Sequence, residues 1–305
     1  MPAPEMDTMT AAAGEPWPVM VLAHNEQRRI AACLDSLFDG EPGRRLEVFV
    51  MANGCTDRTE EITREYAVRR PGVHVVSVAM ADKCNAWNVF IHETVRTRVP
   101  DRDVYFFVDG DCRTVPGSLT RLAQGLRANP SAHAASAPPA SGRSREKDRR
   151  ELLAARALVA NLYALRGTFV QALRDNRVRL PLGLEGDDGL LGALIKWNLN
   201  PTLGGFDDSR IEPCADAGFV FDSMSVWDPV EWRAYWRRAV RYGRRRYEFR
   251  LLAPRLKKLG LQGLPTHIAE LYPDSSTLPL MWDGVYTIPN WVALRDMRKS
   301  VRPRH

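Results

Sequence analysis

The chain has 305 residues, of which 45% are hydrophobic and 26% are charged, and its formal net charge is +6 at pH 7. These values are ordinary for a globular protein and exclude a fibrous or wholly disordered chain. No stretch approaches the roughly 20 apolar residues that a membrane-spanning helix needs, so no such helix is predicted.

The start of the chain and the cysteines bear on its compartment. Residues 1–16 include the acids Glu5 and Asp7 and lack a basic cluster followed by an apolar core, so we expect a flexible leader and not a secretory signal. The five cysteines are scattered and form no CxxC pair. This spacing argues against a disulfide framework and against a structural zinc site, and it favours the reducing cytoplasm.

From Pro18 onward, short apolar runs alternate with stretches of helical periodicity. Strands are predicted at residues 19–23, 46–51, 73–78 and 104–108, and helices at 28–38, 58–68, 86–95 and 119–126. Such alternation is typical of βαβ units with a mostly parallel sheet. We therefore predict a doubly wound α/β domain over residues 17–226.

The second half of the chain is predicted to be more helical. Residues 134–145 suggest a strand and a mobile loop, and apolar residues at every third or fourth position predict one helix over 148–173. A further strand is expected at 218–226. Residues 227–305 are expected to form a C-terminal extension packed on the domain, with a basic amphipathic helix opened by Asp228 and Pro229 and a proline-rich irregular tail.

Two aspartates follow the fourth predicted strand. The uninterrupted apolar run Tyr105–Val108 predicts a strand buried on both faces, and it ends on Asp109 and Asp111. Ligands of open α/β sheets bind at the carboxyl ends of the strands, and two carboxylates that flank a glycine can bind a hard divalent cation. The same residues also suit a solvent-exposed turn, and this stretch alone does not decide between the two interpretations.

Polar residues follow the other three predicted strands. Glu26 could accept hydrogen bonds from a ribose, and Asn53 could recognise the edge of a base. Lys83 could neutralise a phosphate, and Asn88, one helical turn further on, could support the same site. Turn formation and helix capping explain Glu26 and Asn53 equally well.

Another acidic pair, Asp187 and Asp188, stands before an apolar helical run. Acids stabilise the start of a helix through its dipole and its free N–H groups. Taken in isolation, the pair is better interpreted as a helix cap than as catalytic.

Together these residues resemble the inverting glycosyltransferases of family 2, which have the GT-A fold. Each motif is weak alone, but five motifs in order over residues 17–195 make chance a poor explanation. In chain order they are Asn25-Glu26, the turn from Ala52 to Thr59, Lys83 with Ala86 and Asn88, Asp109-Gly110-Asp111, and Asp187-Asp188-Gly189-Leu190-Leu191.

The resemblance implies a metal-dependent transfer from a nucleotide-sugar donor with inversion at the anomeric carbon. Asp188 would be the general base, with Asp187 as the alternative because it replaces the glutamate of the family. The metal, Mg²⁺ or Mn²⁺, would be bound by Asp111 and by Asp109, which also serves the ribose. Contacts to the donor are expected from Glu26, Asn53, Asp57, Lys83 and Asn88.

The resemblance leaves two details open. The family has acids at the positions of Ala52 and Asn53, so recognition of the base is altered; UDP is favoured and GDP is the alternative. Some relatives take another metal ligand from late in the chain, which makes His267 a candidate, although a lone histidine is more often structural.

The basic helix has its own interpretation. Between Trp232 and Lys258 there are eleven Arg and Lys and one acid, a local charge of +10, so the rest of the chain is net −4. Aromatic residues at helical spacing beside arginines favour contact with an anionic membrane or a lipid phosphate. The second interpretation is that Arg241, Arg244 and Arg245 line the active site, and the third is a plain solvated surface.

The expected protein is therefore a cytoplasmic glycosyltransferase that acts on a glycan or lipid-linked saccharide at the inner face of the cell membrane. No nucleic-acid partner is expected, and no oligomeric state is predicted. A sugar nucleotidyltransferase is less favoured because a glycine-rich phosphate loop is missing after the first strand, where the chain reads Ala23-His24-Asn25-Glu26. A non-catalytic binding module would not need five site motifs.

Overall fold

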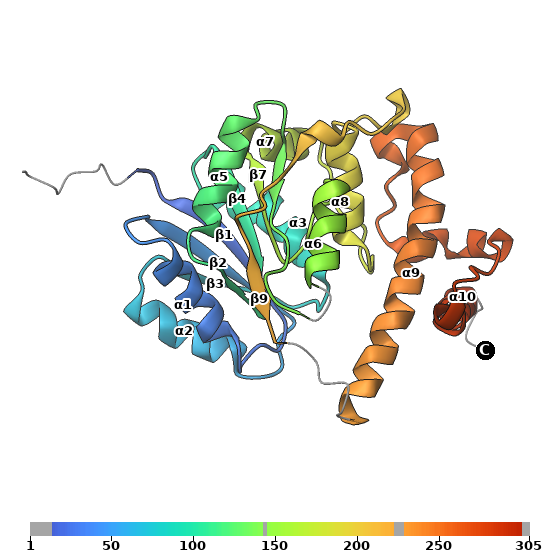
Figure 1. Cartoon of the computed structure of the whole chain (residues 1–305), viewed down its shortest axis with the longest axis horizontal. Coiled ribbons are helices and arrows are strands. Elements are labelled where there is room, and N and C mark those ends of the chain that lie inside the picture. Colours follow the sequence, from blue (N-terminus) through green and yellow to red (C-terminus); the bar gives the residue numbers. More distant parts are fainter. Residues whose placement is uncertain (1–13, 143–144, 223–228, 301–305) are drawn as a thin grey trace, which may run out of the picture.

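The fold is a seven-stranded sheet covered by helices on both faces, with a helical segment beside it (Figure 1). The computed structural model describes residues 14–142, 145–222 and 229–300, so most of the expected leader lies outside the described residues. The strand order is β3-β2-β1-β4-β7-β6-β8. The predicted doubly wound α/β architecture is confirmed.

The first half of the chain supplies the parallel part of the sheet. Strands β1, β2, β3 and β4 pair in parallel, and Leu22 at the end of β1 lies opposite Asp109 at the end of β4. Because these strands run the same way, their carboxyl ends meet at one edge. The elements are β1 (Trp17–Ala23), α1 (Ile30–Gly40), β2 (Leu46–Asn53), α2 (Thr59–Arg69), β3 (Val73–Val78), α3 (Lys83–Val89), a π-helical turn (Phe90–Thr94), α4 (Val95–Arg98) and β4 (Val104–Asp109).

Each face of the sheet packs into its own apolar cluster. In β4, Phe106 joins a cluster with α1, α2 and α5 (Ser118–Ala128), and Phe107 joins the opposite cluster with α3 and α8 (Asp187–Lys196). Successive side chains of a strand point to opposite faces, so a strand covered by helices on both sides is apolar throughout. This explains the uninterrupted apolar run before Asp109.

The helix predicted over residues 148–173 is wrong. The structure has α6 (Arg145–Ala154), then the strand β7 (Leu162–Arg166), then α7 (Gly167–Asp175). Strand β7 is antiparallel to β4 on one side and to β6 (Ala134–Ser136) on the other. Because β7 pairs on both sides, its backbone N–H and C=O groups all find partners in the sheet. This tertiary pairing outweighs the helical spacing of apolar residues from which the helix was predicted.

The remaining strands are short. Strand β8 (Ile211–Pro213) pairs in parallel with β6 and ends the sheet. A separate ribbon joins β5 (Cys112–Thr114) to β9 (Phe219–Phe221). The strand predicted at 218–226 is thus confirmed in its first part, and its end lies with Asp228 outside the described residues.

The C-terminal segment packs on the same core. Helix α9 (Pro229–Leu259) is the predicted basic helix, and its buried Tyr247, Leu252 and Leu256 belong to the cluster that contains α8. In Figure 1, α9 stands beside α8 and α10 lies outside it. Within the described ranges, no helix combines the length and the apolar character that crossing a membrane requires.

The tail is more regular than predicted. The 3₁₀ turns at Gly260–Gly263, Ile268–Thr277 and Gly284–Tyr286 are followed by a full helix, α10 (Thr287–Ser300). Pro289 falls in the first turn of α10, where N–H groups have no partner within the helix, so the proline does not interrupt it.

Candidate active site

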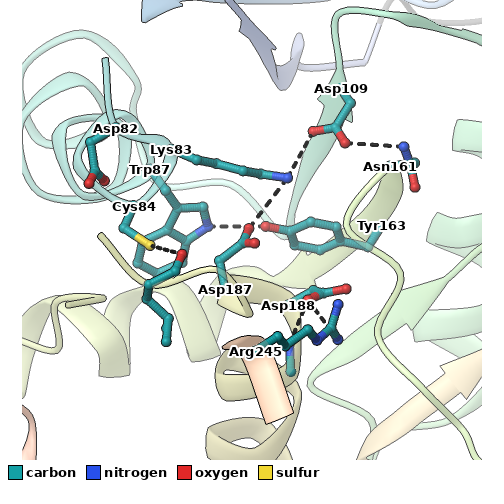
Figure 2. Close-up of polar contacts among 12 residues, drawn as sticks. Asp82, Lys83, Cys84, Trp87, Asp109, Asn161, Tyr163, Asp187, Asp188 and Arg245 are labelled. Carbon is teal, nitrogen blue, oxygen red and sulfur yellow. Dashed lines mark hydrogen bonds and ion pairs between the residues drawn. The ribbon is translucent and has the colours of Figure 1, made fainter. Parts of the chain in front are cut away.

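Lys83 lies at the centre of the edge where the parallel strands end. As the first residue of α3, it places its Nζ 3.2 Å from Asp109 Oδ1 and 3.4 Å from Asp187 Oδ2 (Figure 2). The two carboxylates raise the pKa of Lys83 against the opposing effect of burial. One cation thus joins the end of β4 to the start of α8, and the predicted grouping of these three residues is found.

Asp109 is held on its other side by Asn161. Its Oδ2 accepts a hydrogen bond from Asn161 Nδ2 at 3.1 Å, and its backbone N–H donates to the Asn161 carbonyl, also at 3.1 Å. Burial raises the pKa of Asp109 to about 6; Lys83 opposes the rise, whereas Asp111 and Asp187 add to it. The sequence does not point to Asn161, because the helical spacing of residues 148–173 hides the strand β7 that begins at the next residue.

Glu26 adds a further carboxylate to this edge. Its side chain is 14% exposed, and Arg29 Nε lies 2.9 Å from its Oε2. Burial raises the pKa of Glu26 to about 7; Arg29 opposes the rise, and the acids Asp111, Asp57 and Asp109 contribute to it. The edge therefore carries an excess of closely spaced carboxylates, which a cation would relieve.

Asp109 and Asp111 fit a cation that takes part of its coordination from a substrate. Asp111 Oδ1 accepts a hydrogen bond from the Cys112 thiol at 3.3 Å. In the described part of the chain, no three His, Cys, Asp or Glu side chains are grouped closely enough to bind a metal alone. Magnesium is often bound by one or two carboxylates, with water and substrate phosphates completing its octahedron, and two aspartates satisfy this requirement.

Asn53 lies beside the same edge. It is 5% exposed, and its Oδ1 accepts a hydrogen bond from the Asp82 backbone N–H at 2.9 Å. Its amide nitrogen has no protein partner within the described ranges, and its contact with a nucleoside remains a prediction. Gly54 follows with φ +59°, and a Cβ atom there would lie 2.6 Å from Ala81 Cβ, so the turn requires glycine.

Two predicted site residues, Asp57 and Asn88, have structural contacts of their own. Asp57 accepts hydrogen bonds from the backbone N–H groups of Thr59 and Gln27, which holds the turns after β1 and β2 together. Asn88 is buried and exchanges two hydrogen bonds with the backbone of Leu180. Asn88 therefore supports the segment leading to α8, and direct donor contacts from Asp57 and Asn88 remain predictions.

His267 is an exposed residue outside this cluster of side chains. It caps the 3₁₀ turn that begins at Ile268, together with Glu270, and its backbone pairs with Leu182. Its role as a metal ligand stays a prediction.

The aspartates at the start of α8 face different partners. Asp187 points to Lys83, whereas Asp188 Oδ1 accepts a hydrogen bond from the Gly189 N–H at 2.8 Å and pairs with Arg245 Nη2 at 2.9 Å (Figure 2). Burial raises the pKa of Asp188; Arg245 opposes this effect, and Asp187 adds to it. Asp187 is thus part of the β4 side of the site, and Asp188 faces α9.

Helix α9 is fastened to the segment before α8. Arg244 Nη1 lies 3.8 Å from Glu185 Oε1. The buried Glu248 accepts hydrogen bonds from the Glu185 N–H at 2.9 Å and from the Tyr272 hydroxyl at 2.7 Å. These contacts support the site-lining interpretation for Arg244 and Arg245, whereas Arg241 is exposed and its role stays a prediction.

Comparisons with known proteins bear on the family and the fold. A family model described as Glycosyl transferase family 2 matches residues 19–178. No curated protein matches the sequence.

Many solved structures resemble the chain, among them the following three. The mannosyltransferase PcManGT from Pyrobaculum calidifontis, in complex with GDP-Man and Mn²⁺, has 18% identity and a TM-score of 0.59 over 93% of this chain and 82% of that one. S. aureus TarS 1–349 in complex with UDP-GlcNAc has 15% identity and a TM-score of 0.50 over 93% and 91%. Glucosyl-3-phosphoglycerate synthase from Mycobacterium tuberculosis, in complex with phosphoglyceric acid, has 19% identity and a TM-score of 0.50 over 77% and 78%. At these identities the likeness establishes the shared fold, which is the predicted GT-A fold.

Proposed function

The chain belongs to glycosyl transferase family 2 and is a glycosyltransferase, and we propose that it moves a sugar from a nucleoside diphosphate to an acceptor hydroxyl with inversion. The observation that carries this proposal is the position of Lys83 between Asp109 and Asp187, with Asp188 adjacent (Figure 2). Residues suited to a diphosphate and a residue suited to proton removal are thereby joined in one site. Family membership favours this function over a sugar nucleotidyltransferase and over a non-catalytic binding module.

We assign the donor end of the site to the edge of the sheet. Glu26 and Asn53 would hold the nucleoside, and Lys83 would counter the charge of the diphosphate. Asp109 and Asp111 would hold Mg²⁺ or Mn²⁺, which supplies a Lewis acid that stabilises the charge developing on the leaving nucleoside diphosphate. PcManGT was solved with GDP-Man and TarS with UDP-GlcNAc, so both bases are candidates, and UDP is favoured here.

Asp188 is the proposed general base. It would take the proton of the acceptor hydroxyl while the hydroxyl oxygen bonds to the anomeric carbon and the bond from that carbon to the diphosphate breaks. A single displacement inverts the configuration and needs no covalent intermediate on the enzyme. Asp187 is the alternative base, and it is the less suitable of the two because it faces Lys83 and the donor residues at the end of β4, whereas Asp188 faces α9.

Exposed aromatic side chains of α9 and of the segment that follows it support the proposed contact with an anionic membrane. Trp232, Trp236 and Trp282 are 63%, 46% and 84% exposed, and Tyr286 and Trp291 are about half exposed. In the sequence, Arg233 follows Trp232 and Arg237 follows Trp236. Aromatic side chains beside basic residues suit the interface of an anionic bilayer, so we propose that the acceptor is a glycan or lipid-linked saccharide reached at that surface.

Titration calorimetry and transfer assays test the donor site and the base. UDP is expected to bind with Mn²⁺ more tightly than without it, and Asp111→Ala is expected to remove this metal dependence. Asp188→Asn should abolish transfer and leave donor affinity within about twofold. Weakened donor binding with normal turnover would refute the assignment of Asp188, and an absence of UDP and GDP binding under every condition would refute the donor site.

Cosedimentation with vesicles tests the membrane contact. The protein should sediment with phosphatidylglycerol vesicles and not with phosphatidylcholine vesicles, and Trp232→Ser, outside the cavity beside α8, should weaken this association. Equal sedimentation with both lipids would contradict an electrostatic contact.

A further inference from the structure

A large cavity opens beside the proposed base. Its volume is about 830 Å³, and it lies between the start of α8, the middle of α9 and the segment around Met281. Its wall combines apolar and cationic side chains, among them Phe249, Trp282, Arg245, Arg246 and Arg250. The donor residues of the sheet edge are not part of this wall, so the cavity is a separate space that borders the site through Asp188 and its partner Arg245.

The three arginines differ in what they contact. Arg246 donates hydrogen bonds to Asp283 and to Asn290, each at 2.8 Å. Arg245 forms an ion pair with Asp188. Arg250 is exposed at the cavity and has no hydrogen bond or ion pair within the described part of the chain. Positive charge in the wall is therefore available to a ligand, next to apolar surface from Phe249 and Trp282.

Arg245 fits closely against the start of α8. A Cβ atom at Gly186 would lie 2.7 Å from Arg245 Cγ, and one at Gly189 would lie 3.3 Å from Arg245 Nη2. The two glycines thus leave the room that lets the guanidinium reach Asp188. In this arrangement Asp188 Oδ1 has two donors, the Gly189 N–H and Arg245, and a carboxylate paired in this way is a poor proton acceptor.

We propose that the cavity binds an acceptor that carries a phosphate or carboxylate next to an apolar segment, and that this anion draws Arg245 away from Asp188. The proposal rests on the function proposed above. Arg250 and Arg245 bind the anion, and Asp188, released from its ion pair, takes the proton of the attacking hydroxyl. The acceptor thereby switches on the base that it uses, and the sugar of a bound donor is protected from water until the acceptor arrives.

Octyl phosphate is a suitable probe for the binding step, with octanol as the neutral control. Calorimetry should show saturable binding of octyl phosphate and none of octanol at the same concentration. Arg250→Gln should weaken the binding about tenfold or more, because it removes a charge-assisted contact. The matched control is Lys257→Gln, which changes an exposed cation on the same helix outside the cavity wall and should leave the affinity unchanged. Equal binding of both probes, or an affinity that Arg250→Gln does not change, would overturn the anionic site.

Hydrolysis of the donor by water measures the switch. Octyl phosphate should accelerate release of UDP from a UDP-sugar in the wild type about tenfold. Arg245→Gln should hydrolyse the donor at the accelerated rate without the probe and gain little from it. An unchanged hydrolysis rate in Arg245→Gln would refute the switch. If the wild type still binds the donor and Asp188→Asn abolishes transfer, the proposed function stands even though the switch is refuted.

The same assay separates two sources of the anion. Acceleration by octyl phosphate and also by inorganic phosphate indicates a soluble anionic acceptor. Acceleration by octyl phosphate and by vesicles that contain phosphatidic acid, but not by inorganic phosphate, indicates a lipid phosphate. Both results support the anionic acceptor, and acceleration by neither contradicts it.

Discussion

Replacement of Glu248 by alanine should loosen the attachment of α9 to the active site. The carboxylate is fully buried, and its two oxygens accept hydrogen bonds from the Glu185 N–H on one side and the Tyr272 hydroxyl on the other. The change leaves both donors buried without a partner. Since Glu185 precedes Asp188 by three residues, the position of the proposed base should also be disturbed.

The cost follows from these two contacts. A buried donor that loses its partner costs about 1–3 kcal/mol, so two donors cost roughly 2–6 kcal/mol. Removal of a buried carboxylate recovers part of this cost, because burial raises the pKa of Glu248 and penalises its charged form at neutral pH. We therefore expect Glu248→Ala to lower the free energy of unfolding by about 2–4 kcal/mol at pH 7.

Glu248→Gln provides a graded comparison. Glutamine can accept from the Glu185 N–H and donate to the Tyr272 oxygen, so its cost should be about 1 kcal/mol. The raised pKa gives wild-type Glu248 a stabilising contribution that is complete below about pH 4.5 and is lost as the pH rises through the folded-state pKa. The difference in stability between Glu248→Gln and wild type should therefore narrow between pH 4 and pH 8.

Urea unfolding followed by tryptophan fluorescence measures these differences, and Glu65→Ala on the exposed face of α2 is the matched control. Donor affinity should stay within about twofold in Glu248→Ala while the turnover number falls at least tenfold. A free energy of unfolding within about 0.5 kcal/mol of wild type would show that the two hydrogen bonds do not fasten α9.

Two further predictions concern the sheet edge. The pKa values of Glu26 and Asp109, about 7 and about 6, are raised, so their contribution to stability is present below pH 4 and is lost as the pH rises through 6 to 7. Mn²⁺ binds the ionised carboxylates and should raise the melting temperature more at pH 8 than at pH 5.5; equal shifts by calorimetry would contradict this. Gly54→Ala should lower the free energy of unfolding by about 2–4 kcal/mol and weaken UDP binding, because it adds a steric clash with Ala81 to the strain of a positive φ. Gly43→Ala, with φ +78° and open space around it, should show the strain alone, about 1 kcal/mol, and equal effects of the two changes would argue against the clash.

The sequence indicated which polar residues meet at the edge of the sheet. Asp109 follows a parallel strand, Lys83 begins the helix after another, and strand ends of this kind must share an edge. Each position therefore followed from local pattern and a topological rule. The family model and the similar structures support the same assignment of fold and enzyme class.

The acceptor side could not be predicted in the same way. Arg245 and Asp188 are 57 positions apart, and a local pattern does not show where a helix docks. The arginines of α9 consequently suggested membrane contact before site lining. In the sequence, Glu248 is the one acid between Trp232 and Lys258, and nothing near it indicates burial. The packing of α9 in the structure shows that its side chain is buried.

The direction of β7 has a consequence for how the chain tolerates insertions. Because β7 runs against β4, the residue that enters it, Asn161, lies at the edge where β4 ends. One residue added within β7, between Tyr163 and Ala164, would shift the pairing of part of the strand by a position and turn those side chains to the opposite face. Residues added within the exposed helix α6, which buries none of its side chains, can loop out instead. Natural variation in length, or a reporter peptide inserted by design, should therefore be accepted in α6 and rejected a few residues later.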